Sequence, residues 1–122
     1  MDSKLTHGAF SWMEHRGDKI DATREFYRQA IGWDFPDMPM EDGSAYPGIA
    51  LGDAPIGGFA PHPNAHWLPY ITVDDVDARL QAALKAGAKV LTEAFDAPGV
   101  GRMAVLEDPA GAPVALIRYA TP

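Results

Sequence analysis

The stretch Asp108-Pro109-Ala110-Gly111-Ala112-Pro113-Val114-Ala115-Leu116-Ile117 decides the fold of this chain, because it joins a tight turn to an apolar strand. Its first four residues are typical of a turn, and the residues from Pro113 onward have the composition of a buried strand. A related stretch, Asp53-Ala54-Pro55-Ile56-Gly57-Gly58-Phe59, lies near the middle of the chain. This near-repeat predicts that one small structural unit occurs twice.

The remaining pattern shows the same doubling. The first half indicates a strand, a helix and three strands, at 7–15, 18–32, 33–35, 45–51 and 55–60, with a loop over 37–44. The second half repeats this order at 67–73, 75–87, 88–91, 101–106 and 113–119. Asp18 is expected to cap the first helix, and Gly32 and Gly87 to end the two helices. Equivalent positions lie 55 to 58 residues apart, as in the pair Gly32 and Gly87. Such a spacing is typical of repeated supersecondary units. The alternative is an α+β sandwich whose unrelated halves share turn chemistry by chance.

These elements predict an α+β fold made of two tandem βαβββ modules within a single domain, residues 1–122. The first module is expected over 7–60 and the second over 66–119. Between them, Pro61-His62-Pro63-Asn64-Ala65 is the predicted linker, because two prolines in three residues favour an extended connection without helix.

Composition limits the classes of function. The chain has 122 residues, a formal net charge of −7 and no cysteine. An anionic surface repels phosphate, which argues against a nucleic-acid partner, and the lack of cysteine excludes disulfides and thiol chemistry. No stretch reads as a membrane span or a targeting segment, so a cytoplasmic location and no membrane partner are expected.

Three motifs resemble the vicinal oxygen chelate superfamily, which includes glyoxalase I, bleomycin-resistance proteins and extradiol dioxygenases. Asp18 through Phe26-Tyr27 to Ile31-Gly32-Trp33 is similar to its first-helix signature. Tyr70-Ile71-Thr72-Val73-Asp74-Asp75-Val76-Asp77 resembles the start of its second module, and Asp108-Pro109-Ala110-Gly111 its last hairpin. The resemblance covers residues 7–119 and is greatest to small glyoxalase-like members. It implies paired βαβββ modules whose curled sheets enclose a cavity, and commonly a homodimer.

Metal-dependent members of that superfamily place a His or Gln early in the first strand of a module and a Glu or His in its last strand. In this chain the resemblance carries those positions onto Leu68 and Ala115 in the second module, and onto Ser11 and Gly57 in the first. Three of these four side chains have no donor atom, and a divalent cation needs three or four converging ligands. No metal or other cofactor is therefore predicted, and Glu14 with His66 forms the fallback pair for a weak site.

The residues expected to contact a ligand are aromatic, glycine or polar residues of the strands and one loop: Trp12, Gly57, Gly58, Phe59, Trp67, Tyr70, Thr72 and Arg102. The aromatic residues could instead belong to the core or to a dimer interface. The two glycines could permit a close backbone approach, or mark a bulge or a sheet bend, and Arg102 could be a solvated surface residue.

Glu14 is the candidate catalytic residue. It is the acid of an otherwise apolar and aromatic strand, and a carboxylate in such surroundings suits a general base. In the alternative, it faces water or pairs with Arg16 or Arg118.

Three functions stay open. The first is a glyoxalase- or bleomycin-resistance-like protein that binds a small, partly apolar or aromatic molecule in a metal-free cavity. The second is a lyase, isomerase or dioxygenase-like enzyme that uses Glu14 or a weak metal site. The third is a dimeric interaction protein with a filled cavity.

Overall fold

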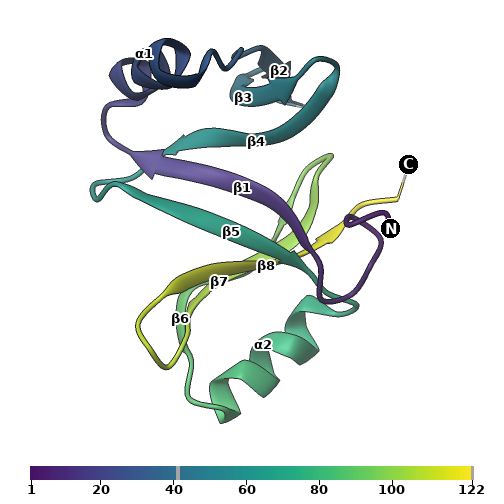
Figure 1. Cartoon of the computed structure of the whole chain (residues 1–122). Coiled ribbons are helices and arrows are strands. Elements are labelled where there is room, and N and C mark those ends of the chain that lie inside the picture. The colour runs from purple at the N-terminus through teal and green to yellow at the C-terminus, as the bar shows by residue number, and fades with distance from the viewer. Residues whose placement is uncertain (41, 122) are drawn as a thin grey trace. The chain divides into compact units, whose positions relative to one another are not determined.

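The structure is a computed structural model that describes residues 1–40 and 42–121. In chain order the elements are β1 (Phe10–Gly17), α1 (Ile20–Ile31), β2 (Asp37–Pro39), β3 (Ala45–Leu51), β4 (Ala54–Pro61), β5 (His66–Thr72), α2 (Val76–Lys85), β6 (Lys89–Ala97), β7 (Gly101–Glu107) and β8 (Pro113–Tyr119). Figure 1 follows them along the chain. The order βαβββ thus occurs twice, as the sequence predicts, and the fold is α+β.

Two compact units account for the described residues. The α1 unit is Trp12–Leu68, and the α2 unit combines Met1–Ser11 with the chain from Pro69 onward. The boundary passes through β1 and through β5, so each of these strands contributes residues to both units. The two units are described separately below.

Each unit contains four strands with the same connectivity. In the α1 unit the strand order is β2–β3–β4–β1, with β1 parallel to β4 and the other pairs antiparallel. In the α2 unit the order is β5–β8–β7–β6, with β5 parallel to β8 and the other pairs antiparallel. The last strand of each module therefore pairs with the first strand of the same module.

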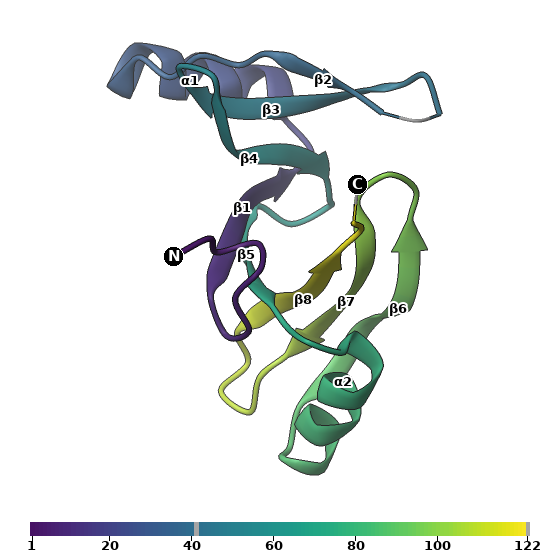
Figure 2. The same cartoon turned by 90° about the vertical axis from the view of Figure 1, so that its right-hand side faces the viewer.

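Each helix covers one face of its own sheet. Val76 and Leu80 of α2 form a buried cluster with Ala104, Leu106 and Leu116, which lie on the sheet face toward the helix. Figure 2 shows α2 alongside β6 and β7. Because side chains alternate along a strand, the neighbouring residues of β5, β7 and β8 face away from α2.

The α1 unit has a more aromatic core. Phe35, Ile49 and Phe59 are buried there, and Ile20 and Tyr27 of α1 pack against them together with Trp33 and Trp67. Helix α1 itself contains no fully buried residue. Its attachment therefore depends on a few partly buried side chains and the aromatic rings beneath them.

Several local predictions need correction. Helix α1 begins after Lys19, whose side chain makes no capping hydrogen bond, so Asp18 lies one residue too early to cap it. Gly32 adopts the left-handed conformation at the helix end, as predicted, with φ of 74°. The expected strand over 33–35 is reduced to one bridge, between Asp34 and Ala50, because Pro36 follows at once. The pairing strand is instead β2, within the predicted loop 37–44.

Strand β6 is longer than predicted. It runs through nine residues to Ala97, whereas the sequence indicated a strand over 88–91. Its register against β7 shifts between Val90 and Thr92 and again between Thr92 and Phe95. Those irregularities break the alternation of apolar and polar residues by which a strand is recognised.

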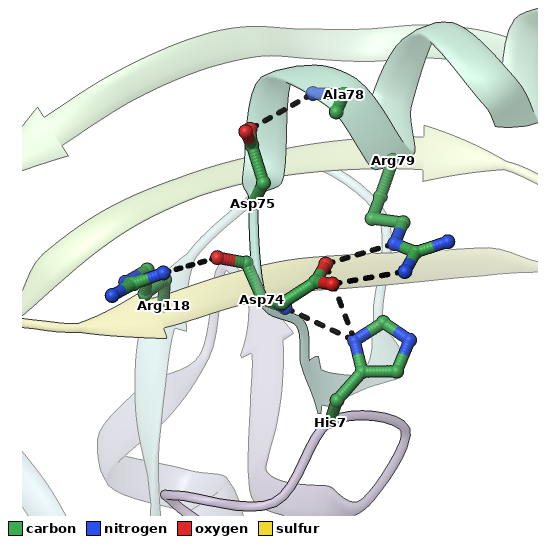
Figure 3. Close-up of polar contacts among 6 residues, drawn as sticks. All are labelled: His7, Asp74, Asp75, Ala78, Arg79 and Arg118. Atoms are coloured by element: carbon green, nitrogen blue, oxygen red, sulfur yellow. Dashed lines mark hydrogen bonds and ion pairs between the residues drawn. The ribbon is translucent and has the colours of Figure 1, made fainter.

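Asp74 connects three parts of the α2 unit at the start of α2 (Figure 3). Arg79 donates two hydrogen bonds to its carboxylate, at 2.8 and 2.9 Å, and Arg118 donates to its backbone carbonyl. Its backbone N–H donates to His7 Nδ1 at 3.0 Å, and the same ring nitrogen lies 3.5 Å from the Asp74 carboxylate. The next residue, Asp75, caps α2 by accepting from the N–H of Ala78.

This arrangement predicts a pH-dependent contribution to stability. The hydrogen bonds from Arg79, and then its charge, hold the pKa of Asp74 at about 2, below its ordinary value of 3.8. Because the pKa is lowered in the folded state, the stabilisation is present above pH 3.8 and is lost as the pH falls toward 2. In Asp74→Asn, the deficit in unfolding free energy relative to wild type should be largest near neutral pH and should shrink over that acidic interval. Urea denaturation at several pH values measures it.

Asp53→Asn, in the turn between β3 and β4, is the control and should show no such pH-dependent deficit. A deficit in Asp74→Asn that stays constant down to pH 2 would contradict the assignment.

Membrane insertion by a helix has no support in the described residues, since neither of their helices is long and apolar enough to cross a bilayer.

Candidate functional site

The candidate site lies in the α1 unit around Glu14. This residue is 5% exposed in the middle of β1. Arg16 donates from Nε to Glu14 Oε1 at 2.7 Å, and the Tyr46 hydroxyl donates to Glu14 Oε2 at 2.7 Å. Burial of a carboxylate is tolerated here because charge-assisted hydrogen bonds replace those to water. Of the predicted alternatives, pairing with Arg16 is the one observed.

The sheet face that carries this site is the one away from α1. His15, the next residue of β1, contacts Tyr27, Phe59 and Trp67, which belong to the core beneath α1. Burial, and then the charge of His66, lowers the pKa of His15, which favours the neutral ring. Since successive side chains alternate, Glu14 points to the opposite face of the sheet.

A row of small residues continues this face across the sheet. Glu14 is paired with Gly58 on β4, and Gly58 is paired with Gly48 on β3. A Cβ at Gly58 would lie 2.0 Å from the Tyr46 ring, and a Cβ at Gly48 would lie 2.3 Å from the Met38 methyl group. The two glycines therefore leave bare backbone, which the side chains of Tyr46 and Met38 cover.

Gly57 has a different role from Gly58. A Cβ at Gly57 would lie 2.2 Å from the backbone oxygen of Met13 on the neighbouring strand. Gly57 also pairs with Ile49, a residue of the core beneath α1. The close approach at Gly57 is thus made by backbone, one of the two alternatives left open by the sequence, and not by a ligand.

Trp12 lies on the same face as Glu14, two residues earlier on β1. Its indole N–H is 3.4 Å from the Tyr46 hydroxyl oxygen, and the two ring centroids are 6.5 Å apart. The partly buried indole therefore borders the cluster of Glu14 and Tyr46, where its flat surface and N–H donor can both contact a small molecule.

Phe59 and Trp67 lie elsewhere. Phe59 is 1% exposed and packs against Phe35, with ring centroids 5.5 Å apart. Trp67 packs edge-on against His15 at 4.8 Å, within the same core. The structure assigns both predicted ligand residues to the core between α1 and its sheet.

Tyr70 and Thr72 belong to the α2 unit, on the sheet face away from α2. Both are buried, and the Thr72 hydroxyl donates to the Ser3 carbonyl at 2.8 Å and lies 2.8 Å from the Ser11 hydroxyl. The Ser11 hydroxyl is in turn 2.8 Å from the Tyr119 hydroxyl. Burial raises the pKa of the Tyr119 phenol, against the opposing effect of its hydrogen bond to Ser11. These hydroxyls fix the N-terminal segment to β5 and β8, so Thr72 has a structural role.

Arg102 lines a groove of about 470 Å³ at the β6–β7 turn, in the α2 unit. Its guanidinium donates two hydrogen bonds to Asp77, at 2.8 and 2.9 Å, and one to Asp96 at 3.2 Å. These bonds, those to Asp77 first, raise its pKa. Two aspartates thus neutralise the cation, and Arg102 joins the first turn of α2 to the β6–β7 hairpin.

The residues at the superfamily's metal positions do not fit a metal. In the α2 unit, Ala115 pairs with Tyr70, and in the α1 unit, Gly58 pairs with Glu14 in the same way. By this register, Trp12 is the first-module counterpart of Leu68, and Gly58 is the counterpart of Ala115. The predicted first-module positions, Ser11 and Gly57, are therefore each wrong by one residue. None of the side chains of Leu68, Ala115, Trp12 and Gly58 supplies an oxygen or imidazole ligand.

The fallback pair has separate partners. Glu14 binds Arg16 and Tyr46, whereas His66 Nδ1 is 2.8 Å from the Asn64 carbonyl and its ring packs edge-on against His62. Over residues 1–40 and 42–121, no three His, Asp or Glu side chains are grouped as metal ligands.

Sequence reasoning missed Tyr46, Met38 and the pairing role of Gly48. Tyr46 lies 32 residues from Glu14 in the chain, so no local spacing relates the two. A glycine in each of two strands beside a buried acid was the available signal, but their cross-strand pairing requires the register of β3 and β4.

Comparison with known proteins agrees with this architecture. The family described as "Glyoxalase-like domain" matches residues 14–117. "Putative glyoxylase CFP32" of Mycobacterium bovis is 38% identical over 117 residues, covering 93% of this chain and 45% of that protein. "Anthracycline biosynthesis protein DnrV" of Streptomyces peucetius is 34% identical over 110 residues, covering 86% of this chain and 39% of that protein. The chain belongs to the glyoxalase-like domain family, and it spans less than half the length of these relatives.

Solved structures show the same fold. Methylmalonyl-CoA epimerase of Streptomyces coelicolor has a TM-score of 0.61 and 19% identity, covering 95% of this chain and 100% of that one. Homoprotocatechuate 2,3-dioxygenase from B. fuscum has a TM-score of 0.64 and 17% identity, covering 92% of this chain and 32% of that one. The vicinal oxygen chelate fold expected from the sequence is confirmed.

Proposed function

We propose that this protein binds a small, partly aromatic molecule that carries a hydroxyl group, without a metal, at the face of the α1 unit around Glu14. The observation that carries the proposal is the buried Glu14 carboxylate, held by Arg16 and hydrogen-bonded to a phenol, that of Tyr46. A fixed acceptor in low-dielectric surroundings selects a ligand O–H, because an analogue lacking the hydroxyl leaves the carboxylate without that bond. The adjacent indole of Trp12 supplies an aromatic surface.

The relatives support the aromatic character of the ligand. DnrV is named for anthracycline biosynthesis, and anthracyclines are polycyclic aromatic compounds that carry hydroxyl groups. Another relative is named "Putative glyoxylase CFP32", so catalysis at the face around Glu14 is the second candidate function. In that case Glu14 would take a proton from a bound substrate, and the Tyr46 hydroxyl would first have to release the carboxylate.

Glu14→Gln tests the proposal with two naphthalene probes. Wild type should bind 2-naphthol more tightly than 2-methoxynaphthalene, which has the same ring but no O–H group. Glutamine keeps the shape and removes the charge, so the preference for 2-naphthol over 2-methoxynaphthalene should fall at least about 10-fold, as expected for one hydrogen bond to a charged group. Isothermal titration calorimetry, repeated with EDTA, measures both affinities.

The matched control is Glu25→Gln, an exposed carboxylate on α1, which should bind both probes like wild type. Binding that disappears with EDTA would contradict the metal-free proposal. Failure of both probes to bind wild type, or an unchanged preference for 2-naphthol over 2-methoxynaphthalene in Glu14→Gln, would contradict the proposed ligand site.

A further inference from the structure

We propose that Tyr46 and Met38 form a displaceable cover over a ligand shelf made by Gly48 and Gly58, and that a hydroxylated planar ligand replaces the Tyr46 phenol against Glu14. This inference rests on the proposed function and adds the exact seat of the ligand and the residues that regulate access to it. Every residue involved belongs to the α1 unit.

The shelf is defined by strand pairing. Glu14, Gly58 and Gly48 are consecutive partners on β1, β4 and β3, so they form one row perpendicular to the strands. Neighbouring strands are about 4.8 Å apart, so the two glycines expose roughly the width of a planar ring system beside the carboxylate. Neither glycine has a left-handed φ, so the backbone conformation does not explain why both lack a side chain.

The cover comes from the edge of the sheet. Met38 lies on β2 and Tyr46 on β3, and the two are directly paired across these strands. The Met38 methyl group covers Gly48, and the Tyr46 ring covers Gly58. Methionine is unbranched and flexible, and the short β2 pairs through only three residues, so this edge has the least backbone support in the α1 unit.

The Tyr46 phenol already makes the contacts that a hydroxylated aromatic ligand would make. Its ring lies on bare backbone, its hydroxyl donates to Glu14 Oε2 at 2.7 Å, and the Trp12 indole N–H is 3.4 Å from its oxygen. The site thus offers a flat surface for a ring, an acceptor for a hydroxyl hydrogen and a donor to the hydroxyl oxygen, which together suit a phenol. The ligand class is therefore a planar aromatic alcohol that competes with Tyr46 for the same acceptor.

Tyr46→Phe tests the competition without creating a cavity. It keeps the ring and removes the hydroxyl that holds the cover against Glu14. For a ligand that binds only the uncovered state, the apparent affinity is the intrinsic affinity multiplied by the fraction of protein that is uncovered. Raising that fraction therefore strengthens binding. We expect Tyr46→Phe to bind 2-naphthol about 10-fold more tightly than wild type, as measured by isothermal titration calorimetry. Tyr27→Phe, in the core beneath α1, is the control and should leave the affinity unchanged.

A second measurement reports movement of the cover directly. In protein labelled at its methionine methyl groups, 2-naphthol should shift the Met38 signal in the NMR spectrum of wild type. The signal of Met13, which lies on the opposite face of β1 from Glu14, should not shift. A purely structural Tyr46 would give no Met38 shift and no gain in affinity in Tyr46→Phe.

The outcomes separate the two proposals. A preference for 2-naphthol over 2-methoxynaphthalene that falls in Glu14→Gln, together with a 2-naphthol affinity that does not rise in Tyr46→Phe, would keep the proposed function and overturn the displaceable cover. Absence of 2-naphthol binding in wild type, Tyr46→Phe and Tyr46→Ala would overturn both. A gain in Tyr46→Phe together with a Met38 shift supports the cover.

Discussion

Replacing Gly57 by alanine will lower the free energy of unfolding by about 2–4 kcal/mol. A Cβ at this position would lie 2.2 Å from the backbone oxygen of Met13, on the strand paired with it. A backbone oxygen within a strand pair cannot rotate away, so β1 and β4 would have to separate locally. Urea denaturation measures the loss, and the melting temperature should fall by roughly 10 °C.

Two other glycines serve as controls for Gly57→Ala. Gly52 has φ of 59° and open space within 4 Å of where a methyl group would lie, so Gly52→Ala should cost only about 1 kcal/mol of left-handed strain. Gly58→Ala meets the Tyr46 ring, a side chain that can move, so its cost should be smaller than that of Gly57→Ala. A Gly57→Ala variant as stable as Gly52→Ala would show that the spacing of β1 and β4 can widen freely.

Phe59→Ala is expected to be equally severe, with a loss of about 3–5 kcal/mol. Phe59 is 1% exposed, and its ring lies 5.5 Å from Phe35 and 5.6 Å from His15, centroid to centroid. Truncation would leave a cavity between α1 and its sheet that rings on several sides cannot fill. Thermal and urea denaturation of the purified variant measure the loss.

Phe10→Ala is the matched control, because Phe10 is 67% exposed and its truncation should change stability by less than about 0.5 kcal/mol. Phe59→Leu keeps most of the packing, so ligand affinity can be measured in it. That affinity should equal the wild-type value, since Phe59 belongs to the core. A selective loss of 2-naphthol binding in folded Phe59→Leu would restore the ligand role that the sequence suggested.

The duplicated fold could be predicted because its signals are local. Turn residues, helix ends such as Gly32, and apolar strands all recur in the same order in both halves. These features depend on residues close together in the chain, and the helical and strand periods distinguish them. The same reasoning singled out Glu14, which is buried at 5% exposure, although its carboxylate is held by Arg16 and the Tyr46 hydroxyl and not by apolar side chains.

The faces of the first module could not be predicted in the same way. Counting from the second module made Gly57 the first-module equivalent of Ala115. The register of β1 and β4 shows that the equivalent residue is Gly58. A register shift between Ile49 and Ala50 in the β3–β4 pair belongs to the same irregular region. Because side chains alternate, an error of one residue moves a position to the other face of the sheet. The contact between Glu14 and Tyr46 depends on this register and on residues far apart in the chain.

The parallel pairing of the first and last strands in each module has a consequence for synthesis on the ribosome. Residues of β1 such as Met13 meet their partner Gly57 only after the whole of the first module has emerged. The segment before β1 waits longer, because Gly8 and Ala9 bond to Thr72, whose strand in turn pairs with β8. Such long-range pairing slows folding and leaves this segment unpaired, and accessible to chaperones, until β8 has been synthesised.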